Sequence, residues 1–169
     1  MAYASNTMSI TIEESRAKTA DFLTRVGTGV LATADASGKP HAATVYITTD
    51  KQLDLYFVTK RDTQKCRNLQ VNPRAAIAVY DAATQTTVQA EGTTLEVTDP
   101  RQQEWIFKDI WSRAAQTTPG GIPPTTQFAA GGYVVFRLSV PSVRVATFTH
   151  PNGAESSDIF EVIHTQPSM

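Results

Sequence analysis

The stretch TKRDTQKCR, residues 59–67, holds four cationic side chains and two hydroxyl groups in nine residues. It lies where a predicted strand, 52–59, gives way to a short predicted helix, 62–71. The first turn of a helix has backbone N–H groups without partners and a positive dipole potential. A phosphate placed there gains those donors, and hydroxyl and lysine side chains can complete its shell. This spacing therefore indicates a candidate phosphate site.

An ordinary solvated helix start explains the same residues. Asp62 is a suitable N-cap, and Thr63 and Lys65 would then fall in the first turn. Lysine in a first turn stands at the unfavourable end of the helix dipole, which is the kind of local conflict that binding sites create. Cys66 follows Lys65, so its thiol pKa could be depressed, although a buried and unreactive cysteine explains it more simply. Both interpretations stay open at this point.

The elements that must position this stretch are mostly short strands. Many short strands with few helices predict a mostly β fold, a closed or nearly closed β-barrel with flanking helices. Thr11 with Glu14 fits a capping box, Asp99 with Pro100 starts a later helix, and Gly92 predicts a bulge. The predicted helices are 11–25, 62–71 and 99–115, and the predicted strands are 29–35, 41–49, 52–59, 75–81, 86–97, a last hairpin of 133–140 with 143–149, and 158–164.

Length and charge limit the class of protein. The chain has 169 residues, which predicts a single domain over 1–169 with 1–10 as a loose arm. The net charge of −1 argues against a nucleic-acid protein that works by bulk charge. The sequence shows no signal peptide and no apolar run near the roughly 18 residues of a membrane helix. We therefore expect a cytoplasmic protein with no membrane or nucleic-acid partner.

Three stretches resemble the pyridoxamine 5′-phosphate oxidase-like, FMN-binding split-barrel family. They are GVLATADASGKPHAATVYI, then LYFVTKRDTQKCRNLQVNPRAAIAVYD, then VQAEGTTLEV. The middle stretch carries a T-x-x-x-T-x-K-x-x-x-L-x-x-N-P motif between two strands. The resemblance covers about residues 26–98, with a weaker echo in 134–148. It implies a six-stranded antiparallel Greek-key split barrel of the FMN-binding type, working as a homodimer with its cofactor groove at the interface.

The resemblance also assigns residues to the cofactor. Thr59, Thr63 and Lys65 would hold the FMN phosphate, and Gln64 stands where the true oxidases have arginine. The backbone of 44–46 would follow the isoalloxazine edge, and either Gln89 or Thr87 would reach the ring or the ribityl chain. The full set is Thr44, Val45, Tyr46, Thr59, Thr63, Gln64, Lys65, Thr87 and Gln89.

Two departures from the family concern the substrate. Ala43 and Thr48 stand where the true oxidases have a phosphate-binding arginine and a substrate lysine. The C-terminal Arg-x-His-Asp-Arg motif of those enzymes is absent. The resemblance therefore implies an FMN-dependent oxidoreductase that is not a true pyridoxamine phosphate oxidase. Its substrate is unknown, and no catalytic acid or base is marked.

Other cofactors stay open. A relative of the same fold could use deazaflavin F420, whose longer acidic tail would need Lys60, Arg61 and Arg67. A non-enzymatic protein could store or sense FMN or haem, with His150 or His164 as the haem ligand. The three histidines, at 41, 150 and 164, show no metal-binding spacing, so we expect no metal site.

Two further segments carry weaker expectations. Trp105 and Trp111 belong to an apolar helix stripe that is typical of packing, although it could also wall the cofactor. The loop 116–132 contains four glycines and three prolines and cannot recover its ordering entropy alone. We expect it to lie across a partner subunit and to bury Phe128 there.

Overall fold

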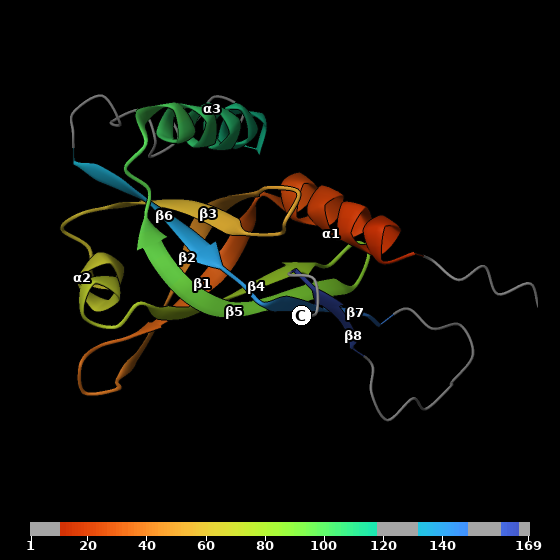
Figure 1. Cartoon of the computed structure of the whole chain (residues 1–169), viewed down its shortest axis with the longest axis horizontal. Coiled ribbons are helices and arrows are strands. Elements are labelled where there is room, and N and C mark those ends of the chain that lie inside the picture. The colour runs from red at the N-terminus through yellow and green to blue at the C-terminus, as the bar shows by residue number, and fades with distance from the viewer. Residues whose placement is uncertain (1–10, 118–131, 149–159, 166–169) are drawn as a thin grey trace, which may run out of the picture.

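The computed structural model describes residues 11–117, 132–148 and 160–165 (Figure 1). Its described helices are α1 (Ile12–Val26), α2 (Gln64–Val71) and α3 (Pro100–Thr117). The described strands are β1 (Thr28–Ala34), β2 (Pro40–Thr49), β3 (Leu55–Lys60), β4 (Arg74–Asp81), β5 (Thr86–Glu96), β6 (Tyr133–Ser139), β7 (Ser142–Thr147) and β8 (Glu161–His164). The expectations for 1–10, for Phe128 and for His150 fall outside the described residues.

Six of these strands close into an antiparallel barrel. Their order is β4-β1-β2-β3-β6-β5, and β5 pairs back onto β4. The strands β7 and β8 extend the sheet outward from β5. The six-stranded antiparallel split barrel implied by the sequence is therefore confirmed.

The strand β5 forms hydrogen-bonded pairs along both of its edges. One edge of β5 pairs with β4, and its other edge pairs first with β7 and then with β6. The expected hairpin of the last two long strands is therefore wrong, because β6 and β7 follow one another along the same edge of β5. Pro141, which has no N–H to donate, lies at the break between them.

The expected bulge at Gly92 is also wrong, because the register of β5 with β4 runs without interruption through this residue. Thr93 pairs with Ser139, so an unbroken register would pair Ala90 with Ser142. Ala90 pairs instead with Val143, the next residue. The extra residue thus lies in the β6–β7 chain. Gly92 is needed for a different reason, since a Cβ there would come within 2.0 Å of the Ser139 carbonyl oxygen.

The three described helices pack against the ends and the outer face of the barrel. The barrel is filled by its own side chains, and α1 and α2 lie at opposite ends of it, where Leu23 and Leu69 join the core (Figure 1). The helix α3 lies over the outer face of β2, β3 and β6, where Ile106 and Ile110 pack against Val135. The side chains of β3 alternate between the two faces: Leu55 and Phe57 face the barrel core and Tyr56 faces α3.

Local sequence signals set the ends of the helices. The capping box of Thr11 and Glu14 is present at the start of α1, and Gly27 ends that helix in a left-handed conformation with φ of 65°. The Asp99 carboxylate accepts a hydrogen bond from the Arg101 amide at the start of α3, as predicted. None of the described helices is long and apolar enough to cross a membrane.

The close approach at Gly92 generates a stability prediction. Gly92→Ala should lower the free energy of unfolding by about 3 kcal/mol, because the new methyl group meets backbone rather than a movable side chain. Gly132→Ala is the matched control, since no atom lies within 4 Å of a Cβ at that position. Urea denaturation of the two variants measures the difference. Equal stability of both variants would show that β5 does not need glycine at this crossing.

Candidate functional site

A groove of about 240 Å³ lies where β2, β3 and β6 meet the start of α2. It brings together six of the nine residues that the sequence assigned to the cofactor: Thr44, Val45, Tyr46, Thr59, Thr63 and Lys65. The other lining residues are Val58, Lys60, Ile110 and Tyr133. Sequence reasoning missed three lining residues, Val58, Ile110 and Tyr133. Ile110 lies on α3 and Tyr133 on β6, both far along the chain from the motif of residues 59–73, so no local motif marks them.

The start of α2 is built around the Thr63 hydroxyl. Thr63, and not Asp62 as expected, is the N-cap, and its side chain accepts from the Cys66 amide. The same hydroxyl donates to the Lys60 carbonyl at 2.8 Å and lies 3.0 Å from the Thr59 hydroxyl. The end of β3 therefore selects Thr63, because only this side chain meets both the helix and the strand.

The four cations of residues 59–67 have different roles. Arg61 forms an ion pair with Glu96 at 2.6 Å, and Arg67 donates to the Asp62 carbonyl and to Gln64. The Lys60 ammonium lies 5.8 Å from the centre of the Tyr133 ring. Lys65 is half-buried in the groove and has no hydrogen bond or ion pair with any described residue. Two lysines therefore line the groove without an ion pair to a described residue, the half-buried Lys65 and the exposed Lys60.

The amide of Gln64 is occupied away from the groove. Its Nε2 donates to the Asn68 Oδ1 at 2.7 Å, and its Oε1 accepts from Arg67 at 3.0 Å. Asn68 in turn donates to the Thr33 hydroxyl inside the barrel end. Gln64 thus links α2 to the barrel, and the side chain does not line the groove that its neighbours line.

Thr87 and Gln89 do not lie at the groove either. Both are on β5, and the Thr87 hydroxyl donates to the Val79 carbonyl at 3.1 Å. Thr44, Val30, Ala78 and Gln89 are successive cross-strand neighbours from β2 to β5. Three strand spacings, roughly 14 Å, therefore separate Gln89 from Thr44. Within one copy of the chain the two groups of predicted residues stay apart.

The remaining candidate side chains lie outside the groove. Cys66 is fully buried, and burial raises the pKa of its thiol, which favours the unreactive cysteine over a depressed pKa. His41 and His164, the histidines in the described part of the chain, are absent from the groove lining. Trp105 packs edge-to-face on Tyr56, and neither Trp105 nor Trp111 reaches the groove.

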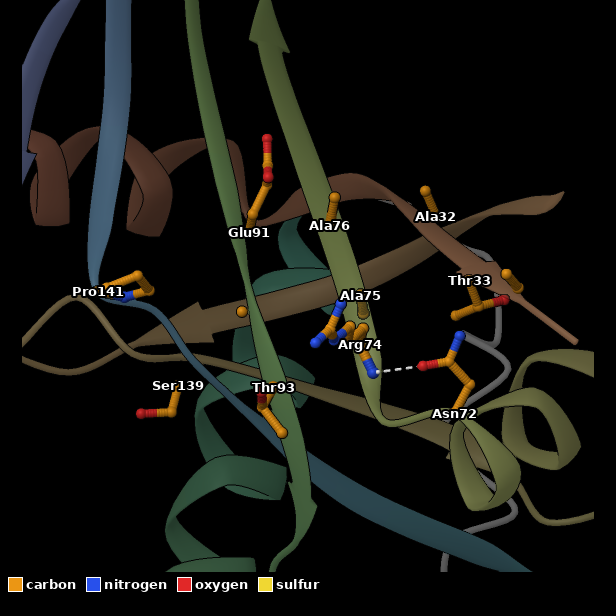
Figure 2. Close-up of a pocket in the computed structure, with 12 residues that line it drawn as sticks. Ala32, Thr33, Asn72, Arg74, Ala75, Ala76, Glu91, Thr93, Ser139 and Pro141 are labelled. Atoms are coloured by element: carbon orange, nitrogen blue, oxygen red, sulfur yellow. Dashed lines mark hydrogen bonds between the residues drawn. The ribbon is translucent and has the colours of Figure 1, made fainter. Parts of the chain in front are cut away.

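A larger and more open hollow of about 600 Å³ lies elsewhere on the barrel (Figure 2). Alanine residues of β1 and β4 and Gly92 of β5 line it, together with Arg74 and Glu91. Figure 2 shows Asn72 accepting a hydrogen bond from the Arg74 backbone at its margin. None of the nine predicted site residues lines this hollow.

Comparison with known sequences places the groove in a family context. The sequence model described as pyridoxamine 5′-phosphate oxidase matches residues 15–149. A pyridoxine/pyridoxamine 5′-phosphate oxidase of Anaeromyxobacter dehalogenans is 36% identical over 69 residues, which are 41% of this chain and 35% of that protein. The matched part thus spans about a third of that curated relative.

Solved structures share the fold at low sequence identity. A conserved hypothetical protein of Mycobacterium tuberculosis aligns with a TM-score of 0.65 and 22% identity over 93% of this chain and 100% of that one. A heme-binding protein of Mycobacterium smegmatis gives 0.64 and 16%, covering 94% and 60% of the two chains. An F420 reductase gives 0.58 and 23%, covering 73% and 93%. At these identities the likeness concerns the fold alone.

The N-cap assignment can be tested directly. Thr63→Ala should lower the free energy of unfolding by about 1 kcal/mol, because the Cys66 amide loses its acceptor. Asp62→Ala should change stability by less than about 0.5 kcal/mol, because the exposed Asp62 side chain caps nothing. Thermal denaturation of the two variants compares them. A larger loss in Asp62→Ala would return the N-cap to Asp62.

Proposed function

We propose that this chain, which belongs to the pyridoxamine 5′-phosphate oxidase family, binds FMN in the groove at the start of α2 and acts as an FMN-dependent oxidoreductase. The observation that carries the proposal is Lys65, a half-buried residue that lines the groove and has no hydrogen bond or ion pair with a described residue. An anionic ligand in the groove would give this cation a charge-assisted hydrogen bond. The cytoplasmic location expected from the sequence is part of the same proposal.

The start of α2 has the donors that a phosphate requires. The Gln64 and Lys65 amides occupy the first turn, where the helix itself supplies no acceptor. The first turn contains no acidic residue, so nothing there repels an anion. Thr59 and Thr63, whose hydroxyls lie 3.0 Å apart, line the same groove as Lys65, and hydroxyl groups can contribute to the shell of a phosphate. In this proposal Lys65, Thr59 and Thr63 hold the phosphate.

The rest of the groove suits a planar ring. The β2 residues Thr44, Val45 and Tyr46 form one wall, and the apolar side chains of Val58 and Ile110 form others. Bound FMN supplies redox chemistry through its ring, while the protein orients it and excludes water. A groove of about 240 Å³ is small for the whole cofactor, so part of FMN must lie beyond what one copy encloses.

A second copy of the chain would complete the site. The outer face of the barrel next to Thr44 exposes apolar residues: Val30 is 47% exposed and Tyr80 57% exposed. Gln89 and Thr87 lie on the strand that borders this face, too far from the groove of their own copy. Packing this face on its two-fold mate would bury the apolar residues and bring Gln89 toward the partner's groove. We therefore include a homodimer in the proposal.

The alternative cofactors fit the groove less well. The acidic tail of F420 would need several free cations, but of the three expected for it Arg61 and Arg67 are bonded to other residues of the protein and Lys60 alone lines the groove. A haem would need a ligand, and neither described histidine lines the groove. The absorption spectrum of the purified protein distinguishes the three cofactors. A haem or deazaflavin spectrum without flavin would replace the FMN proposal.

The substrate of this proposal is not pyridoxamine 5′-phosphate. Ala43 has no charge, and Thr48 is 1% exposed on β2, so neither can take the place of the arginine and the lysine of the true oxidases. We expect pyridoxal phosphate formation by the FMN-loaded protein to stay at background in a coupled assay. Turnover on the order of 1 per second, an ordinary enzyme rate, would contradict this expectation.

The phosphate site makes a quantitative prediction. Lys65→Ala should raise the dissociation constant of FMN about 10- to 100-fold, because a charge-assisted contact is lost. Arg61→Ala, which removes a cation of the same segment that is paired with Glu96, should change it by less than about threefold. Quenching of flavin fluorescence measures both constants. Equal effects of the two substitutions would mean that general positive charge, and not the groove, attracts FMN.

The dimer makes a second prediction. Val30→Asp should shift the protein toward monomer and weaken FMN binding together, because the two equilibria are coupled. Val71→Asp adds the same charge at an apolar residue that is 63% exposed on α2, away from this face. Sedimentation with and without FMN measures both. A monomeric Val30→Asp variant with unchanged FMN affinity would show that one copy holds the complete site.

A further inference from the structure

A second cavity of about 420 Å³ adjoins the cofactor groove. It lies between the end of α1 and the middle of α3, and Tyr46 lines both this cavity and the groove. On α3 the consecutive residues Asp109 and Ile110 line the cavity and the groove respectively. The two spaces therefore meet at one side chain of β2 and one turn of α3, so a molecule in the cavity would lie beside the occupant of the groove.

The polar groups of the cavity are arranged by Arg113. Its guanidinium donates to the Thr24 carbonyl at the end of α1 and to the Asp109 Oδ1 at 2.7 Å. Arg113 therefore joins the two helices, and its donors are directed at the protein. The charge of Arg25, the other cation of the lining, is paired with Asp81 at 2.8 Å. Neither cation is left to attract an anion into the cavity.

The Asp109 carboxylate has acceptor capacity to spare. Its Oδ2 is enclosed and has no hydrogen-bond partner in the described part of the chain. An enclosed carboxylate oxygen without a donor is costly. The terminal torsion of aspartate is soft, so rotation of the carboxylate, which also turns Oδ1 relative to Arg113, can present the oxygen to the cavity. A ligand that brings an N–H or O–H group would satisfy it.

The end of α1 favours the same kind of ligand. The last carbonyl groups of a helix carry partial negative charge, and the residues Thr24 to Gly27 at this end line the cavity. The Thr24 carbonyl accepts from Arg113 and the Gly27 carbonyl from the Ile47 amide, so the carbonyl groups of Arg25 and Val26 remain for this effect. An anion would meet these carbonyl groups and the Asp109 carboxylate together. The Tyr46 hydroxyl, with no hydrogen-bond partner in the described residues, offers a further polar contact at the junction with the groove.

We propose that this cavity is the substrate subsite beside the cofactor groove and that it takes a small uncharged molecule with an N–H or O–H donor, held by Asp109. The role as a substrate subsite rests on the proposed flavin function. The binding of a donor-bearing molecule at Asp109 does not, because it depends on this cavity alone. The same chemistry excludes carboxylates and phosphate esters of similar size.

Benzamide and benzoate form a matched pair of probes. They share one ring, but benzamide carries an uncharged carboxamide with N–H donors and benzoate carries an anionic carboxylate. On FMN-free wild-type protein, calorimetric titration should give a dissociation constant of about 1 mM for benzamide, as small fragments reach, and at least tenfold weaker binding of benzoate. Equal affinities for the two probes would overturn the assignment of ligand class.

Asp109→Asn tests the residue itself. The carboxamide places an N–H where the carboxylate had only acceptors, so benzamide should bind at least tenfold more weakly and the preference over benzoate should shrink or reverse. Asp21→Asn, the same change at an exposed residue of α1 outside the cavity, should leave both affinities unchanged. Unchanged selectivity in a folded Asp109→Asn variant would overturn the role of Asp109.

Two further measurements keep the proposal testable. Ser112→Tyr adds bulk at an exposed edge of the cavity without touching the Arg113 ion pair, and it should abolish benzamide binding even if Asp109→Asn does not fold. Saturating benzamide should also perturb the absorption spectrum of bound FMN. If benzamide binds and the flavin spectrum is unchanged, the cavity is not a subsite of the flavin groove, although the FMN site itself would stand.

Discussion

The barrel is closed and filled by its own side chains, and the position of every candidate site follows from this constraint. Leu31, Ile47, Phe57 and Val79 are almost inaccessible to solvent inside it. A six-stranded barrel leaves no interior space for a planar ligand. Closure itself depends on β5, which passes Ser139 so closely at Gly92 that a side chain would collide. A cofactor can therefore bind only outside, where helices lean against the barrel wall.

The groove and the adjoining cavity are both products of how helices meet that wall. The helix α2 begins beside the end of β3, because Thr63 bonds to both the strand and the helix. The helix α3 lies across β2 and β3 and separates the two spaces at Tyr46. Charge then distinguishes them: the groove keeps the unpaired Lys65 ammonium, whereas the cavity keeps an unpaired carboxylate oxygen. One space thus suits an anion and the other a hydrogen-bond donor.

Sequence reasoning succeeded where the signal is local. The capping box of Thr11 and Glu14 located the start of α1, and the motif of residues 59–73 located α2 between two strands. It failed where distant segments decide the outcome. Asp62 is the better N-cap by residue type, but the end of β3 selects Thr63. The continuous course of β6 and β7 along β5 depends on long-range pairing that no turn residue announces. The pairing of Arg61 with Glu96 takes one of the four cations of residues 59–67 away from ligand binding, and it joins residues that are far apart in the sequence.

The central claim is that the start of α2 holds the phosphate of FMN. Riboflavin has the same ring and ribityl chain and lacks only that phosphate, so the ratio of the two affinities isolates the contribution of this site. Fluorescence titration of the wild-type protein with each flavin measures the ratio. The account predicts that FMN binds at least about tenfold more tightly than riboflavin, through the charge-assisted contacts at Lys65 and the first turn of α2. Equal affinities for FMN and riboflavin would contradict it.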